Sequence, residues 1–218
     1  MSGCGKPVRR RRNAARGSRI VRRITNLHGA CAVEGKIILL NGASSSGKST
    51  LARGLQATLA EPFWHVSVDH LHAAGILPKA RIKSREFPWP TLRPQFFDGF
   101  HRCLPVLAEA GNNLIVDHIV ETEDWMRQLL DLLGRFDVFF VGVHCPLAEL
   151  ERRERERGDR RIGEARHDYE TTHGFGIYDF EVDSTRPPDH NVDAVVTAWN
   201  DRQPPAAFAK MARRNGPA

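Results

Sequence analysis

A glycine-bounded loop at residues 42–49 combines residue types and spacing that predict phosphate chemistry. It reads Gly-Ala-Ser-Ser-Ser-Gly-Lys-Ser and matches the pattern G-x-x-x-x-G-K-[ST]. The glycines let the backbone turn so that amide N–H groups point at phosphate oxygens, and the N-terminus of a following helix adds positive potential. The loop therefore predicts a nucleotide-binding site formed by Gly42, Ala43, Ser44, Ser45, Ser46, Gly47, Lys48, Ser49 and Thr50.

Two side chains of this loop have defined roles in that chemistry. Lys48 would bridge the β- and γ-phosphates during transfer, and the Ser49 hydroxyl would bind Mg²⁺. A chance match in a Gly/Ser-rich loop is the alternative. The context favours the functional interpretation, because an apolar run at residues 36–41 precedes the loop and a helix-like stretch at residues 48–60 follows it.

Asp69 closes a second apolar run, at residues 65–69, and is a candidate catalytic base. A carboxylate at the end of such a strand could orient an acceptor hydroxyl and take its proton as the phosphoryl group departs. Aspartate is also a favoured helix N-cap, and Asp69 would suit a helix that begins near Leu71. The pattern alone is compatible with both roles.

Asp117 ends the run at residues 113–117 in the manner of a Walker B aspartate, which holds Mg²⁺ directly or through water. A loop cap is the alternative. The phosphate loop favours the metal role, so the predicted Mg²⁺ ligands are Ser49 and Asp117. We interpret His70 and His118, which follow the two acids, as polar contacts rather than ligands or bases.

A run of alternating Glu and Arg at residues 149–161 has the i,i+4 spacing of a salt-bridged helix with a solvated charged face. The dipeptide Gly158-Asp159 interrupts that helix. Arginines on both sides of the break would suit a mobile lid that closes over the nucleotide and neutralises charge on the transferring group. These catalytic candidates are Arg153, Arg157 and Arg160.

Strands and helices must position these residues. Five apolar runs, at residues 36–41, 65–69, 113–117, 137–143 and 180–183, alternate with helix-like stretches at 48–60, 93–110, 123–133, 147–157 and 193–200. Such alternation predicts an α/β fold with helices on both faces of one parallel sheet, and ligands at the carboxyl ends of its strands. Residues 73–94, rich in proline, basic residues and aromatics, are predicted to form an irregular insertion over that edge, where Phe87 and Trp89 could line an acceptor pocket.

Charge is unevenly distributed along the chain. The formal net charge is +6, but residues 1–33 carry nine basic residues and no acid, so the rest of the chain is slightly acidic. We expect a basic, disordered tail over residues 1–33 and one domain over residues 34–218, with a lid near residues 152–166. Nucleic-acid binding would rest on the tail alone.

The four cysteines form no CxxC pair and no zinc-binding pattern, and no apolar run approaches the length of a membrane span. These features favour a reduced, cytoplasmic protein that does not contact membranes. The sequence carries no signal for the oligomeric state.

Six segments resemble, in order, the chloramphenicol phosphotransferase-like family: residues 41–49, 66–69, 110–117, 141–145, 153–160 and 178–183. The resemblance covers roughly residues 36–200. It implies a P-loop kinase fold with a parallel sheet of strand order 2-3-1-4-5, and ATP as the phosphoryl donor. It also implies that Asp69 is the base for the acceptor hydroxyl, that the three arginines belong to the lid, and that the loop after Asp183 lies near the adenine.

The resemblance does not extend to the acceptor pocket. Between Asp69 and Arg93 the sequence shows no close correspondence to the antibiotic-modifying member, and the pair Asp117-His118 stands where a second acid is expected in that enzyme. The resemblance therefore implies kinase chemistry without naming the acceptor.

Three hypotheses follow. The first is an O-kinase for an antibiotic-, nucleoside- or sugar-like hydroxyl. The second is a kinase for a nucleotide-sugar or an RNA end; the basic tail together with Arg81, Lys83 and Arg85 would favour such an anionic acceptor. The third is a non-enzymatic, nucleotide-gated protein whose tail binds nucleic acid. The presence of Asp69 favours the kinases, because a switch needs no acceptor base.

Overall fold

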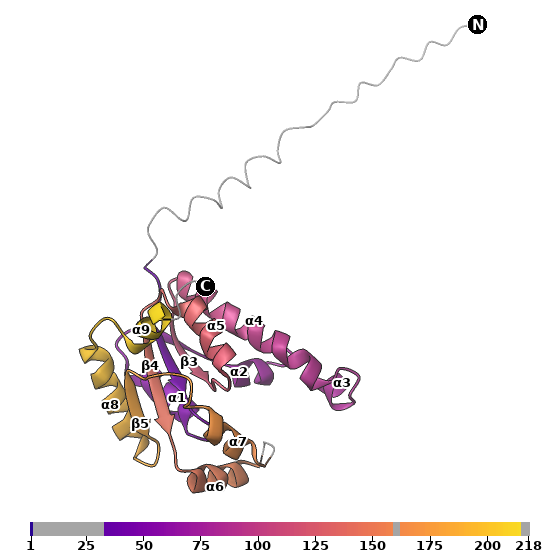
Figure 1. Cartoon of the computed structure of the whole chain (residues 1–218). Coiled ribbons are helices and arrows are strands. Elements are labelled where there is room, and N and C mark those ends of the chain that lie inside the picture. Colours follow the sequence, from indigo (N-terminus) through magenta and orange to yellow (C-terminus); the bar gives the residue numbers. More distant parts are fainter. Residues whose placement is uncertain (2–32, 159–161, 215–218) are drawn as a thin grey trace. The chain divides into compact units, whose positions relative to one another are not determined.

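Five apolar runs form one parallel sheet in the computed structural model, which describes residue 1, residues 33–158 and residues 162–214 (Figure 1). The strands are β1 (Ile37–Asn41), β2 (Phe63–Ser67), β3 (Asn113–His118), β4 (Val138–His144) and β5 (Phe180–Asp183). Their order is β2-β3-β1-β4-β5, which confirms the order 2-3-1-4-5. The predicted tail lies outside the described residues except at its two ends.

The helices are α1 (Lys48–Thr58), α2 (Val68–Ala73), α3 (Lys79–Lys83), α4 (Trp89–Glu109), α5 (Glu123–Leu133), α6 (Leu147–Arg157), α7 (Glu164–Thr171), α8 (Pro188–Asp201) and α9 (Ala207–Arg214). Among the described residues, none of them combines the length and hydrophobicity needed to cross a bilayer.

Alternation along the buried central strand assigns the helices to two faces of the sheet. Ile37 and Leu39 of β1 pack in a cluster with residues of α4, α5 and α9, whereas Ile38 and Leu40 pack with residues of α1 and α8. Both faces are therefore apolar, as expected for a parallel strand covered on each side. The predicted three-layer α/β architecture is confirmed.

The segment at residues 73–94 is more regular than predicted. It contains α3 and the first turn of α4, which begins at Trp89 rather than near Arg93. Pro88 precedes α4 and Pro90 lies in its first turn, where a missing N–H costs no hydrogen bond. The prediction of an irregular insertion was wrong for these residues, and Figure 1 shows α3 and the start of α4 projecting away from the sheet.

Candidate functional site

The glycine-bounded loop connects β1 to α1 at the carboxyl edge of the sheet. Gly47 has a φ of 93°, a left-handed conformation that glycine adopts without strain. A Cβ on Gly42 would lie 2.5 Å from the carbonyl oxygen of Val143, so only glycine allows the loop to approach β4 this closely. The two glycines of the motif are thus required by local geometry.

Polar groups inside the loop fit an anion. The N-terminus of α1 has no side-chain cap, and the buried hydroxyls of Ser45 and Ser46 have no hydrogen-bond partner in the described part of the chain. Buried polar groups without partners are costly, and a phosphate at the helix N-terminus would supply them. The loop therefore fits the phosphates of a nucleotide.

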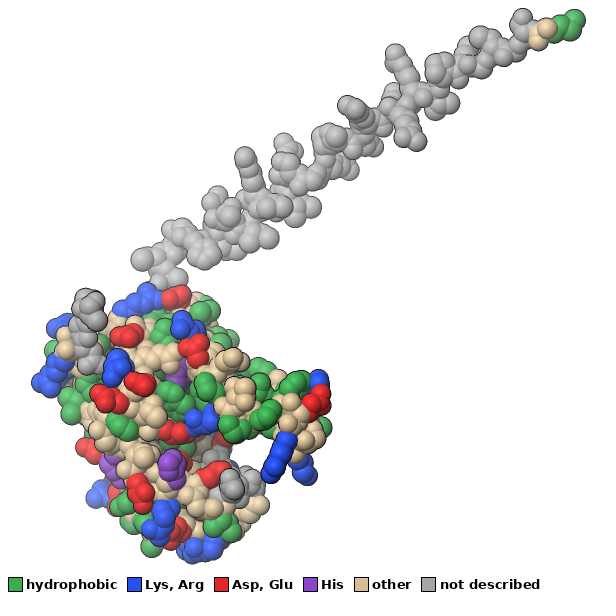
Figure 2. Space-filling model, turned by 45° about the vertical axis from the view of Figure 1, so that its right-hand side comes forward, with side chains coloured by type: hydrophobic (Ala, Val, Ile, Leu, Met, Phe, Trp, Pro, Cys, Tyr) green, Lys and Arg blue, Asp and Glu red, His purple; other side chains and the backbone are tan. Residues whose placement is uncertain are grey.

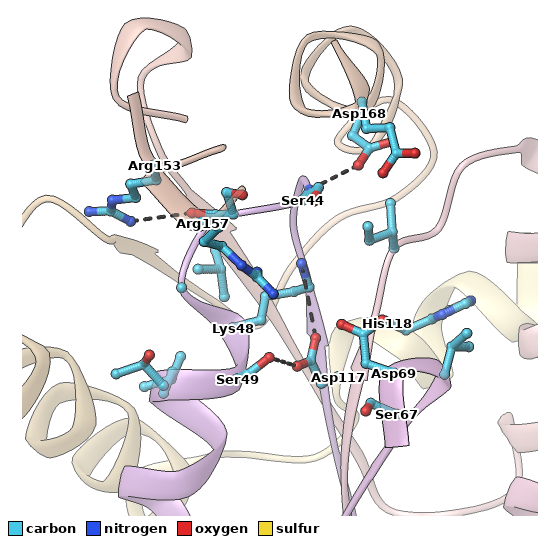
Figure 3. Close-up of a pocket in the computed structure, with 18 of the residues that line it drawn as sticks. Ser44, Lys48, Ser49, Ser67, Asp69, Asp117, His118, Arg153, Arg157 and Asp168 are labelled. Carbon is cyan, nitrogen blue, oxygen red and sulfur yellow. Dashed lines mark hydrogen bonds and ion pairs between the residues drawn. The ribbon is translucent and has the colours of Figure 1, made fainter. Parts of the chain in front are cut away.

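Lys48 is buried at the same place. Its Nζ donates hydrogen bonds of 2.8 Å to the carbonyl oxygens of Gly42 and Ala43 and lies 4.0 Å from Asp117 Oδ1. Figure 3 shows Lys48 directed into the cavity beside Ser49 and Asp117. The structure thus brings together the lysine and the two predicted metal ligands.

Ser49 and Asp117 fit a magnesium site. The Ser49 hydroxyl donates a 2.6 Å hydrogen bond to Asp117 Oδ2, so both oxygens already face one point. Burial raises the pKa of Asp117, but nearby His65, Lys48 and Ser49 outweigh it and lower the pKa to about 2. The carboxylate is therefore ionised, as a metal ligand must be. Mg²⁺ is usually held by one or two protein oxygens, with phosphates and water completing its coordination, and these two side chains fit that pattern.

Asp69 does not cap a helix. Strand β2 ends at Ser67, whose side chain accepts a hydrogen bond from the backbone N–H of His70 and so caps α2. Asp69 lies in the first turn of α2, exposed, and lines the same cavity as Lys48 and Asp117. The N-cap alternative for Asp69 is therefore excluded. The strand begins and ends two residues earlier than predicted.

The cavity has a volume of about 1440 Å³, enough for a nucleotide together with a second molecule. Figure 2 shows the hollow beneath the projecting α3–α4 segment. The phosphate loop and the helices α6 and α7 line one side of it. The other side is called here the acceptor side. It is lined by residues 67–70, His72, Ala73, Trp89, Arg93, Phe97, His118, Ile119 and Glu121.

The segment predicted to be a lid, residues 152–166, contains the end of α6 and the start of α7. Arg153 donates to the side chain and the carbonyl oxygen of Ser184, at 3.2 and 2.9 Å, and so joins α6 to the loop after β5. Arg157 lines the cavity. Both arginines therefore face the nucleotide side, whereas Arg160 lies outside the described residues.

Two acids in α6 and α7 were missed by sequence reasoning. Glu154, interpreted as part of a solvated face, is buried and accepts hydrogen bonds of 2.9 Å from the backbone N–H groups of Gly163 and Ala165 at the start of α7. Asp168 of α7 accepts a 2.9 Å hydrogen bond from the backbone N–H of Ser44. The contacts join residues 9, 11 and 124 positions apart, and no local pattern in the sequence indicates them.

On the acceptor side, Arg93 forms an ion pair with Glu121 through contacts of 2.5 and 2.6 Å. Its guanidinium also lies over the rings of Phe97 and Trp125, at 4.7 and 5.0 Å from their centroids. Trp89, which the sequence suggested as a pocket residue, lines the cavity as expected, but Phe87 does not.

A polar cluster that contains two histidines lies behind the loop. Asn41 donates a 2.9 Å hydrogen bond to the Tyr178 hydroxyl, which also lies 2.7 Å from His173 Nδ1, and His144 stacks on His173. Burial, followed by the nearby His144 and Lys48, lowers the pKa of His173 from 6.5 to about 4.

We expect the free energy of unfolding to fall as the pH is lowered from about 6.5 to 4, because in this range the unfolded chain binds a proton at His173 that the folded chain does not. The contribution is on the order of 1 kcal/mol after solvent screening. Urea unfolding at several pH values measures it. His173→Gln should flatten the pH dependence, whereas exposed His190→Gln should not, and equal slopes for both variants would contradict the assignment.

Comparisons with known proteins identify a family for this chain. Residues 35–200 match the family model described as chloramphenicol phosphotransferase-like protein. A Mycobacterium tuberculosis protein named "Putative O-phosphotransferase" is 31% identical over 201 residues, which cover 83% of this chain and 89% of that protein.

Solved structures resemble the fold. An APS kinase of Mycobacterium tuberculosis in complex with AMPPNP and APS has a TM-score of 0.59 and 20% identity, with 77% of this chain and 99% of that chain covered. A gluconokinase from Sinorhizobium meliloti has a TM-score of 0.51 and 16% identity, with 84% and 95% covered. At these identities the likeness identifies the fold, which is that of P-loop kinases.

Proposed function

Since the chain belongs to the chloramphenicol phosphotransferase-like family of phosphotransferases, we propose that it transfers the γ-phosphoryl group of ATP to a hydroxyl of a small-molecule acceptor. One observation carries the proposal. Asp69 lines the same cavity as Lys48 and the hydrogen-bonded pair of Ser49 and Asp117, so a candidate base faces a candidate phosphate and metal site. Nucleotide binding alone would not require such a carboxylate.

Each group would act on a defined part of the reaction. Backbone N–H groups of residues 42–49 and the Lys48 ammonium would hold the phosphates, and Ser49 and Asp117 would hold Mg²⁺. When bound, Mg²⁺ neutralises negative charge on the phosphates. Asp69 would orient the acceptor hydroxyl and accept its proton.

The lid would supply further positive charge. We propose that residues 34–218 form the catalytic domain and that Arg153, Arg157 and Arg160 stabilise the transferring phosphoryl group from a lid near residues 152–166. The contact of Arg153 with Ser184 supports a position near the nucleotide for this arginine.

The acceptor side supports a neutral acceptor. Among the described residues that line it, Arg93 is the only lysine or arginine, and its charge is compensated by Glu121 and covered by two aromatic rings. An anionic acceptor would therefore meet no uncompensated cation there, and would face the carboxylate of Asp69. Antibiotic-, nucleoside- and sugar-like hydroxyl compounds fit this environment.

Glu121→Gln should change this preference. The substitution leaves the Arg93 charge uncompensated, so we expect KM for phosphorylated or sulfated acceptors to fall about tenfold. This corresponds to about 1.4 kcal/mol of added attraction between Arg93 and the acceptor. KM for neutral acceptors should change much less. Steady-state kinetics with a charged and a neutral acceptor at two salt concentrations test this, and an equal change for both acceptors would contradict it.

A second proposal, a kinase for a nucleotide-sugar or an RNA end, is supported by the projecting segment. Lys79, Arg81, Lys83 and Arg85 are exposed there, outside the lining of the cavity, and blue side chains mark its tip in Figure 2. Only a long acceptor would reach both this tip and Asp69. The kcat/KM for such a long anionic acceptor would fall steeply as the salt concentration rises, whereas that for a small neutral acceptor would not.

The decisive test uses γ-labelled ATP and Mg²⁺ with a panel of hydroxylated antibiotics, nucleosides, sugars, nucleotide-sugars and an RNA oligonucleotide. Label on one acceptor supports the proposal and names its class. If ATP binds but no acceptor is labelled, the non-enzymatic hypothesis gains support. Salt-sensitive nucleic-acid binding that disappears on removal of residues 1–33 would then be its expected signature.

A further inference from the structure

His118 has a position that the proposed reaction does not yet use. It is the last residue of β3, directly after Asp117, and its side chain lines the acceptor side of the cavity while remaining only 3% exposed. Its ring is stacked on Trp125 with an interplanar angle of 18°, and Phe100 lies 5.3 Å away. The ring is therefore held in one orientation by packing.

A chain of buried hydrogen bonds leads from this ring to the surface. His118 Nε2 lies 2.9 Å from His101 Nε2, and His101 Nδ1 lies 2.8 Å from Gln128 Oε1. Gln128 Nε2 in turn donates a 2.5 Å hydrogen bond to Asp98 Oδ1. The chain joins β3, α4 and α5 and ends at the half-exposed carboxylate of Asp98.

The carboxylate sets the direction of every bond in this chain. The Arg102 guanidinium lowers the pKa of Asp98, so this side chain is ionised and can only accept hydrogen bonds. Gln128 must therefore direct its NH₂ group toward Asp98 and its carbonyl oxygen toward His101. That oxygen can only accept, so the hydrogen of His101 must be on Nδ1.

The tautomer of His101 in turn determines the tautomer of His118. Burial lowers the pKa of His101, which is fully enclosed. The ring of His118 is only 3% exposed and packs against Phe100 and Trp125, and such apolar surroundings favour the neutral form. Because His101 carries its hydrogen on Nδ1, its Nε2 is an acceptor, and His118 must donate from Nε2. The remaining ring nitrogen of His118, Nδ1, carries no hydrogen and has no hydrogen-bond partner in the described part of the chain.

We propose that His118 is a specificity-determining residue whose Nδ1 accepts a hydrogen bond from the phosphoryl acceptor, held in the required tautomer by His101, Gln128 and Asp98. The acceptor would then carry a second hydrogen-bond donor, a hydroxyl or an N–H group, in addition to the hydroxyl that receives the phosphoryl group. Polyhydroxy compounds and amino alcohols belong to this class. This proposal has two parts, the tautomer of His118 and its contact with the substrate, called here the substrate half. Only the substrate half rests on the proposed function.

The tautomer can be tested without any activity. Nitrogen-15 NMR of the full-length protein reports which ring nitrogens carry hydrogen. We expect His118 to be protonated at Nε2 and bare at Nδ1. Asp98→Asn allows the Gln128 amide to rotate, so this variant should lose the single tautomer. Asp124→Asn is the matched control, because Asp124 also pairs with an arginine of its own helix but is not part of the chain. A hydrogen on Nδ1 of His118 in the unmodified protein would overturn the proposal.

The substrate half is tested with methyl glucoside, ribonucleosides and amino alcohols, each compared with a derivative in which one non-reacting hydroxyl is methylated. We expect the derivative that lacks the second donor to lose about 10- to 100-fold in kcat/KM. His118→Gln keeps an N–H group near Nε2 but lacks Nδ1, so it should remove this discrimination and leave KM for ATP unchanged.

The outcomes separate the two proposals. Discrimination that persists in His118→Gln, or equal use of both members of each pair by the unmodified protein, would overturn the role of His118. Failure to label any compound while ATP still binds would contradict the proposed function, and the substrate half would fail with it. The NMR result decides the tautomer in either case.

Discussion

Replacing Asp69 by asparagine is expected to slow phosphoryl transfer to the acceptor about 10²- to 10⁴-fold, the usual contribution of a general base. Asparagine keeps the shape of the side chain and can still orient a hydroxyl, but it cannot take the proton. The fold should tolerate the change, because Asp69 is exposed and Ser67, not Asp69, caps α2. Binding of ATP should persist, since Asp69 contributes to the acceptor side of the cavity.

The measurement is kcat for the labelled acceptor together with the Kd for ATP. Asp189→Asn is a matched control, because Asp189 is also an exposed acid in the first turn of a helix and does not line the cavity. Transfer by Asp69→Asn at a rate close to that of the control would show that another group, or water, accepts the proton. Loss of ATP binding in Asp69→Asn would instead indicate that its effect is structural.

Replacing Lys48 by methionine is expected to reduce kcat/KM for ATP by about 10³-fold or more, because a fixed positive charge is lost where negative charge develops. Lys48 is 6% exposed and its ammonium lies 4.0 Å from Asp117, so no solvent cation can readily take its place. Unlike the Asp69 variant, this one should also weaken ATP binding itself.

Folding must be separated from function in this case. Burial of Asp117 is no longer offset by Lys48 in the variant, so the pKa of Asp117 should rise and stability should fall. Lys48→Arg keeps the charge and should retain stability while losing most of the activity. Lys36→Met is the matched control, because Lys36 forms its ion pair with Glu61 away from the cavity. Full activity of Lys48→Met would exclude the proposed phosphate role.

The parts of the fold that sequence reasoning predicted correctly are encoded locally. The phosphate loop is a contiguous motif whose glycines are required at fixed places, one for its left-handed φ and one for close packing on β4. The central strands are apolar on both faces because helices cover both faces, so uninterrupted apolar runs revealed them. The strand order was predicted only through the family resemblance, because periodicity says nothing about which strands are neighbours.

Boundaries were less predictable than elements. The apolar pattern of a strand can continue past the residue where the strand's backbone hydrogen bonds end. For this reason β2 was predicted to reach Asp69. In the structure it ends at Ser67, which caps α2. Prolines in residues 73–94 suggested irregular structure, but Pro88 and Pro90 occupy helix-start positions where they are tolerated.

The sequence by itself thus determined the phosphate loop, the buried strands and the identities of the two acids, Asp69 and Asp117. The tertiary structure decided which groups from distant parts of the sequence lie around the phosphate loop and the two acids. Glu154 connects α6 to the start of α7, and Asp168 bonds to the phosphate loop. A series of hydrogen-bonded side chains from three elements orients the ring of His118. Contacts of this kind join residues 9 to 124 positions apart, so their energy depends on tertiary packing rather than on local spacing. For this reason no sequence motif predicts them.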